Sequence, residues 1–136
     1  NLQAAIACVH LECIDELQPR NREIRQRYRA LLAECAGIAM NPEPAGTVNG
    51  AWMPTVVFDR ATGVTRERLQ AAFAAADIDA RVFFHPLSSL PMFAPCAGGA
   101  LAADLPGRAI NLPSFHDITD EEQQRVAAIV RQVLRG

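Results

Sequence analysis

The chain has 136 residues, of which half are hydrophobic and 21% are charged, a length and balance that predict one soluble globular domain and exclude two domains of ordinary size. The net charge of −2 gives no general attraction to nucleic acid or to an anionic membrane. No apolar run approaches the ~20 residues that cross a bilayer and no secretory leader is recognisable, so we expect a cytoplasmic protein.

An amphipathic helix is predicted at the start of the chain. Its apolar residues recur at steps of three and four: Leu2, Ile6, Val9, Cys13 and Leu17. Pro19 interrupts the pattern, which resumes as Ile24, Tyr28, Leu31, Leu32 and Cys35. Because proline removes a backbone hydrogen bond and clashes with the preceding turn, we expect either a kinked long helix or two abutting helices, ending at Gly37.

The segment "RNREIRQRYR", residues 20–29, contains five arginines. Glu16 with Arg20 and Glu23 with Arg27 have the spacing of ion pairs on a helix surface. The run therefore predicts a solvated charged face, with a phosphate-binding patch as the alternative.

A strand is predicted from Trp52 to Phe58, after the turn-forming segment "NPEPAGTVNG", and Pro54 belongs near its start or on a sheet edge. A helix follows, with Thr65 as its N-cap and with Val64 and Leu69 spaced as a hydrophobic staple. The expected buried stripe of this helix consists of Leu69, Ala72, Phe73 and Ala76.

A second strand is predicted from Asp79 to Phe84, with Arg81 on the same face as Asp79 and Phe83. Residues 86–107 are predicted to be mostly loop, with one short helix near residues 100–105. The segment "RAINLP" predicts a third strand that ends at Pro113.

The last helix is predicted from a capping box formed by Thr119 and Glu122. Its apolar stripe consists of Val126, Ile129, Val130, Val133 and Leu134. The order of elements predicts an α+β domain, a small and mostly antiparallel sheet with helices packed on it.

Arg81 is the best single candidate for a ligand-binding residue. A guanidinium at the end of a strand offers a planar set of donors suited to a carboxylate or a phosphate. The alternative is a structural ion pair with Asp79 or a neighbouring acid. The residues alone leave both interpretations open.

Two other kinds of site are disfavoured. Ser88 and Ser89 lie near His85, but no glycine-elbow motif surrounds either serine, which argues against a hydrolase. The histidines and cysteines are too scattered to predict a metal site: His10, His85, His116, Cys8, Cys13, Cys35 and Cys96. We expect His10 to be a packing residue, and Cys13 and Cys35 to act as small hydrophobic side chains on apolar helix faces.

All thirteen basic residues are arginine, so the chain has no lysine that could form an imine or act as a base. The sequence also starts at Asn1 within a helical pattern and without an initiator methionine. Both features lead us to expect part of a longer protein.

Four segments in order resemble the DegT/StrS-type sugar aminotransferases, closest to their perosamine-synthase-like branch. They are "NLQAAIACVHLECIDEL", "RNREIRQRY", "ADIDARVFFHPLSSLPMF" and "INLPSFHDITDEEQQRV". The resemblance implies that residues 1–136 are the C-terminal small domain of a fold type I, pyridoxal 5′-phosphate (PLP)-dependent enzyme. Such an enzyme transfers an amino group from an amino acid, with glutamate as the expected donor, to a nucleotide-linked keto-sugar in polysaccharide or antibiotic sugar biosynthesis.

The resemblance also implies partners for the chain. PLP, the Schiff-base lysine and the other catalytic residues would belong to an N-terminal domain that is absent here, so this chain alone is expected to be catalytically silent. It would contain no catalytic, cofactor-binding or metal-binding residue. The enzyme would be a homodimer, with the first helix near the junction between domains and subunits.

The resemblance implies substrate contacts in the segment around Arg81. Arg81 is expected to bind the anionic portion of the substrate, and His85 to contact the sugar or the edge of the cofactor. Phe84, with Pro86, would form a wall of the cleft, and Ser88 would contact the substrate in place of a histidine common in the family. At His10 the chain likewise departs from the family's usual glutamine.

A different class of function stays open. The chain could be a stand-alone α+β module that binds a small molecule or regulates another protein, without enzymatic activity. A start codon close to Asn1 and the absence of PLP chemistry would distinguish this alternative.

Overall fold

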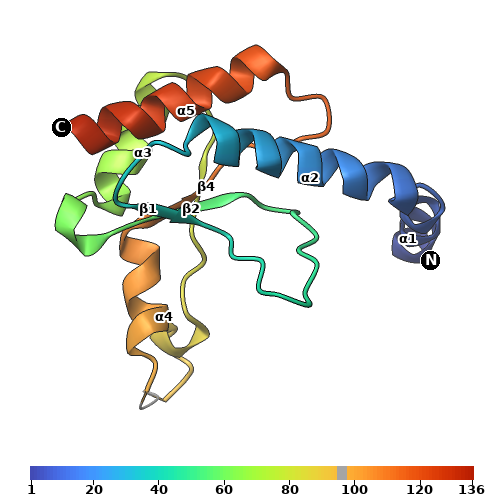
Figure 1. Cartoon of the computed structure of the whole chain (residues 1–136). Helices are drawn as coiled ribbons and strands as arrows, with labels where there is room; N and C mark the ends of the chain where they lie inside the picture. The colour runs from blue at the N-terminus through green and yellow to red at the C-terminus, as the bar shows by residue number, and fades with distance from the viewer. Residues whose placement is uncertain (95–97) are drawn as a thin grey trace.

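The computed structural model describes residues 1–94 and 98–136 (Figure 1). Cys96 lies outside these residues. The helices are α1 (Leu2–Glu12), α2 (Ile14–Leu31), α3 (Arg66–Ala75), α4 (Ala100–Asp104) and α5 (Asp120–Arg135). The strands are β1 (Ile38–Met40), β2 (Thr55–Phe58), β3 (Arg81–Val82) and β4 (Ala109–Asn111). Short 3-10 helices occupy Arg60–Thr62, Leu87–Ser89 and Leu105–Gly107.

The strands form one antiparallel sheet in the order β1-β2-β4-β3. Helices α2, α3 and α5 cover one face of this sheet, while α4 and the loops next to it extend from the opposite side (Figure 1). The predicted α+β class is therefore confirmed.

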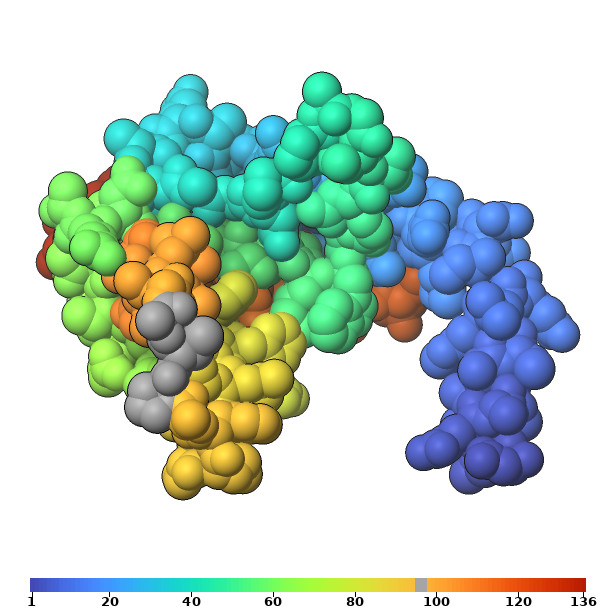
Figure 2. Space-filling model, turned by 90° about the horizontal axis from the view of Figure 1, so that it is seen from below, coloured from blue at the N-terminus to red at the C-terminus, as the bar shows by residue number. Residues whose placement is uncertain are grey.

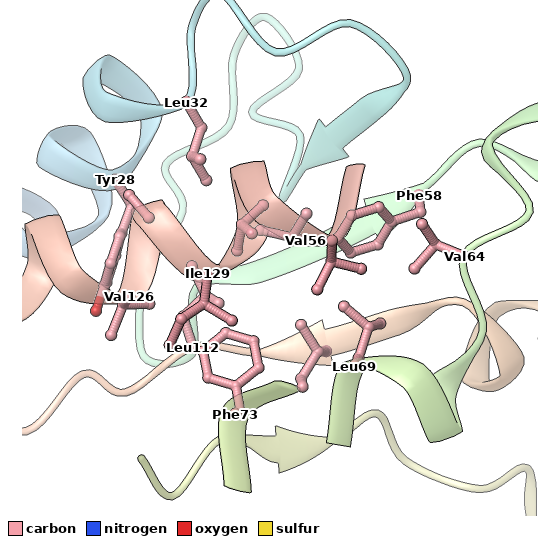
Figure 3. Close-up of a cluster of buried hydrophobic side chains, with 14 of the residues drawn as sticks. Tyr28, Leu32, Val56, Phe58, Val64, Leu69, Phe73, Leu112, Val126 and Ile129 are labelled. Carbon is pink, nitrogen blue, oxygen red and sulfur yellow. The ribbon is translucent and has the colours of Figure 1, made fainter. Parts of the chain in front are cut away.

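The hydrophobic core fills the space between the sheet and the three covering helices (Figure 3). Leu69 and Phe73 of α3 are buried there, as predicted, while Ala72 and Ala76 are only partly buried. The predicted stripe of α5 is also confirmed, except that Leu134 is only partly buried. The sheet contributes Val56, Phe58 and Ile110 to the same cluster.

The first two helices abut at Cys13, six positions before the expected break at Pro19. Pro19 lies inside α2 on an exposed surface, where water can reach the carbonyl group that its missing N–H leaves free. Helix α2 ends at Leu31 rather than at Gly37. Gly37 instead belongs to the turn before β1, with a φ of 80° that favours glycine.

The strand bounds differ from the predictions at three places. The predicted strand from Trp52 begins only at Thr55, because Pro54 has no N–H and the Thr55 N–H donates to the side chain of Asn41. The predicted strand 79–84 is reduced to Arg81–Val82 at the sheet edge. Strand β1, three residues long, was missed because it is too short to show an alternating pattern.

The arginines of α2 make contacts that their spacing does not predict. Arg20 donates to the carbonyl oxygens of His116 (2.9 Å) and Ile118 (2.7 Å), and its ion pair is with Glu23 rather than Glu16. Arg27 pairs with Asp120 at 2.7 Å, not with Glu23. The predicted solvated face is therefore wrong for these two arginines, which attach α2 to the segment that leads into α5.

The predicted capping box of α5 is confirmed. Thr119 Oγ1 accepts from the Glu122 N–H at 3.2 Å, and the Thr119 N–H donates to Glu122 Oε2 at 2.7 Å. Because this cap satisfies two N–H groups at the helix start, Thr119→Ala is expected to lower the free energy of unfolding by about 1 kcal/mol. Urea unfolding measures the loss, and Thr119→Ser, which keeps the hydroxyl, should show little of it.

The pH dependence of the cap gives an independent check. The Thr119 N–H donating to the carboxylate holds the pKa of Glu122 below its ordinary value of 4.5. A lowered pKa in the folded state stabilises the fold above 4.5, and that contribution is lost as the pH falls from there through the lowered value. In Glu122→Gln, the free energy of unfolding should therefore fall less steeply as the pH drops below 4.5. The same pH dependence in the variant and the unmodified chain would contradict the role of Glu122 in the cap.

Candidate functional site

The four predicted substrate-binding residues are all exposed, but they do not converge on one site. Phe84 lines a hollow with Trp52, whereas His85 and Ser88 line a second hollow with Arg66. Arg81 lines neither of these two hollows. The resemblance therefore grouped side chains that the structure distributes over neighbouring surfaces.

Arg81 forms the ion pair with Asp79 that was one of its two interpretations. The two groups are 3.0 Å apart, and the side chains are 77% and 76% exposed. An ion pair this exposed contributes little to stability, so Asp79 is readily exchanged for another anion. The pairing register puts Arg81 beside Asn111, which in turn faces Thr55, so the three side chains share the sheet face away from the helices.

The first hollow lies on that helix-free face and has a volume of about 320 Å³. Its aromatic lining residues are Trp52, Phe83 and Phe84, and the tilted rings of the two phenylalanines are 6.2 Å apart. The other lining residues are Asn41, Asn49, Gly50, Ala51, Met53, Thr55 and Asn111. None of these lining residues is charged.

The polar groups of this first hollow are bonded within the protein. Thr55 Oγ1 donates to Asn111 Oδ1 at 2.8 Å, and Asn111 Nδ2 donates to the Val82 carbonyl oxygen at 3.2 Å. Asn41 Nδ2 donates to the Met53 carbonyl oxygen at 3.2 Å. The lining therefore leaves its aromatic rings as the main groups available to a ligand.

The loop of residues 41–54, which carries Trp52, is anchored to α2 by Arg25. The Arg25 side chain is buried and donates to Glu43 Oε2 (2.9 Å) and to the Asn41 carbonyl oxygen (3.0 Å). Glu43 Oε1 accepts from the Asn49 N–H at 2.9 Å, and this bond, together with Arg25, holds the pKa of Glu43 below its usual range. The loop is thus fixed without regular secondary structure.

The backbone next to Trp52 is held in an unusual conformation. Ala51 has a φ of 55°, a left-handed conformation that costs a non-glycine residue of order 1 kcal/mol or more. Its N–H donates to Asn49 Oδ1 at 2.8 Å, and the Trp52 carbonyl oxygen accepts from Ser114 Oγ at 3.2 Å. Trp52 itself is 69% exposed.

The second hollow has a volume of about 670 Å³. Arg66 of α3 and His85 supply its basic groups, and Ser88 and Ser89 also line it. Ser89 Oγ donates to the Pro86 carbonyl oxygen at 2.7 Å and Arg66 pairs with Glu67 at 3.2 Å. The surface suits an anion or a hydroxyl group, and no hydrogen bond prepares either serine as a nucleophile among the contacts of the described residues.

The expectations for His10, Cys13 and Cys35 can be compared with the structure. The packing role predicted for His10 is wrong, because His10 is exposed on α1, and Cys13 is likewise exposed rather than packed. Cys35 is half-buried against the core, in the turn after α2.

Within residues 1–94 and 98–136, no group of three potential ligands could hold a metal ion. No described helix is long and apolar enough to span a membrane.

Sequence reasoning missed Trp52, Asn41, Asn111 and Arg25. The sequence predicts Trp52 as a strand residue, and the others belong to a predicted turn, a predicted strand and a charged run. The one available signal was the proline after "AWM", which separates Trp52 from the strand.

Residues 1–131 match the model of the DegT/DnrJ/EryC1/StrS aminotransferase family. EpsN of Bacillus subtilis, named as a pyridoxal phosphate-dependent aminotransferase, is 31% identical over 96% of this chain and 34% of its own length. GDP-perosamine synthase of Vibrio cholerae is 31% identical over 96% of this chain and 36% of its own. The crystal structure of DesI with its TDP-sugar product is 25% identical with a TM-score of 0.78, over 91% of this chain and 33% of DesI. The chain thus spans about a third of the length of these relatives.

Proposed function

The chain belongs to the DegT/DnrJ/EryC1/StrS aminotransferase family, and on this premise we propose that it is the C-terminal domain of a PLP-dependent sugar aminotransferase. The enzyme transfers an amino group from an amino acid, glutamate in this proposal, to a nucleotide-linked keto-sugar. The observation that carries the proposal is the family match over residues 1–131. The names of the relatives support the substrate class, since one is a GDP-perosamine synthase and DesI was crystallised with a TDP-sugar.

The residues of this chain do not themselves fit PLP. The internal imine of such an enzyme needs a lysine amine, and all thirteen basic residues here are arginines. The proposal therefore assigns the cofactor to a domain outside this sequence and derives no chemical step from this chain. The role left to the chain is to bind and orient the substrate.

The exposure of helix α1 supports the proposal that another domain or subunit packs against the N-terminal part of this chain. None of the residues of α1 is buried, and in Figure 2 it stands apart from the body of the protein. Eight of its eleven residues are apolar, and the exposed ones include Leu11 as well as Ile6 and Val9 of the predicted stripe. A helix with this much exposed apolar surface normally packs against another part of a protein. We propose that the enzyme's own N-terminal domain and a second subunit bury the apolar side chains of α1.

The proposed function is tested with the protein encoded by the complete gene. Incubated with PLP, glutamate and nucleotide-linked keto-sugars, it should form 2-oxoglutarate and an amino sugar in equal amounts. The 136-residue chain alone is the control and should form neither. A reading frame that starts close to Asn1, or a complete protein without this activity on any keto-sugar tried, would instead favour a stand-alone binding module.

Arg81 is proposed to bind the substrate's phosphate groups. A hydrogen bond to a charged group contributes about 1.5–3 kcal/mol, so Arg81→Ala should raise KM for the nucleotide-sugar about 10- to 100-fold. The matched control is Arg60→Ala, because Arg60 is equally exposed and pairs with Asp104 at 3.1 Å. Steady-state kinetics on the complete enzyme measure both, and an unchanged KM for Arg81→Ala would remove Arg81 from the site.

A further inference from the structure

We propose that the hollow between Trp52 and Phe84 is a stacking site for the base of the nucleotide-linked substrate. The inference rests on the proposed function for the identity of the ligand, but its evidence comes from the loop, the lining and the position of Arg81. It assigns Trp52, Phe83 and Phe84 as the residues that hold the base.

The first argument is that Trp52 is held in solvent by a rigid support. Trp52 is 69% exposed, although its loop is tied to a buried arginine and its neighbour Ala51 adopts a positive φ. Backbone strain at a position that the surroundings fix is typical of a binding site, because it keeps a contact group in place before the ligand arrives.

The second argument concerns the chemistry of the lining. The hollow has aromatic walls, no charged lining residue, and polar groups that already bond to each other or to the backbone. Such a site suits a flat, neutral ring and not a phosphate or a carboxylate. Its volume of about 320 Å³ lies at the lower end of the range for small-molecule sites, roughly 300–1,000 Å³.

The third argument is the position of Arg81 relative to the hollow. Arg81 lies opposite Asn111 in the β3–β4 register, and Asn111 lines the hollow. A base held by Trp52 and Phe84 would therefore have a cation one strand away, on the same sheet face. That arrangement matches a nucleoside diphosphate, which joins a neutral ring to an anionic group.

The test uses the 136-residue chain, whose core is formed by its own residues and whose only tryptophan is Trp52. Tryptophan fluorescence is recorded during titration with guanosine, thymidine, GDP, TDP, a free hexose and inorganic pyrophosphate. We expect saturable quenching by at least one of the two nucleosides and by its diphosphate, with tighter binding of the diphosphate. Hexose and pyrophosphate should leave the emission unchanged.

The decisive variant is Phe84→Ala, which removes one wall and keeps the reporter. Base stacking on an aromatic ring is worth enough that its loss should weaken nucleoside binding about 5- to 100-fold. Phe115→Ala is the matched control, because Phe115 is 53% exposed against 60% for Phe84 and lines a different hollow. Circular dichroism confirms that both variants are folded.

Three results would overturn the inference: no saturable quenching by either nucleoside, equal quenching by hexose or pyrophosphate, or equal affinity in Phe84→Ala and the unmodified chain. Because the titration needs no catalysis, its outcome is separable from that of the proposed function. Nucleoside binding by a protein whose complete form is not a transaminase would support the hollow and overturn the proposed function. Transaminase activity without nucleoside binding would do the reverse.

Discussion

Truncating Phe73 to alanine is expected to lower the free energy of unfolding by about 3–5 kcal/mol. Phe73 is 1% exposed and points from α3 into the core, toward Leu112 and Ile129 (Figure 3). Its removal leaves a cavity at the centre of the cluster that joins α3, α5 and the sheet.

Urea unfolding followed by circular dichroism measures this loss. Gln70→Ala on the exposed face of the same helix is the control and should change stability by no more than about 0.5 kcal/mol. Phe73→Leu fills part of the cavity and should fall between the two. If Phe73→Ala lowered the free energy of unfolding as little as Gln70→Ala does, the packing of α3 on the sheet would be contradicted.

Replacing Ile6 and Val9 of α1 with aspartate is expected to abolish assembly of the complete enzyme while leaving the stability of this chain almost unchanged. Each of these side chains, once buried, contributes about 1.5–3 kcal/mol, so losing both should weaken association at least about 100-fold. The chain itself should be unaffected, because both residues are exposed and α1 has no buried residue.

Sedimentation of the complete protein measures the association, and urea unfolding of the 136-residue chain measures its stability. The matched control places two aspartates at Ala71 and Ala74, which are exposed on α3 and carry no proposed contact. Assembly should survive in that control. If the α1 variant assembled as well as the control, the proposal that α1 is buried in the assembled enzyme would be wrong.

The parts of the fold that the sequence predicted are those with local signals. The capping box of α5 needs only Thr119 and Glu122, three residues apart, and both bonds form as predicted. The stripes of α3 and α5 repeat over several turns, so Leu69, Phe73 and most of the α5 stripe were recognised as core. Patterns of this kind depend on helix geometry alone.

The parts that were missed depend on contacts between distant segments. Arg25 lies in a run of arginines, and nothing in that run distinguishes the one whose side chain is buried against Glu43. Trp52 belongs to the site only because the sheet order brings β2 near β3 through β4. The resemblance groups Arg81, Phe84, His85 and Ser88 in one segment. The structure separates them into different surfaces because the chain leaves the sheet after Val82.

The anchored loop of residues 41–54 has a consequence for local unfolding. Two of its amide hydrogens, on Asn49 and Ala51, and that of the next residue, Thr55, are donated to side chains rather than to a neighbouring strand. Exchange of these hydrogens with solvent therefore requires that Glu43, Asn49 and Asn41 release them. Since Arg25 donates to both Glu43 and the Asn41 carbonyl oxygen, we expect exchange at these three positions to depend on the Arg25 side chain.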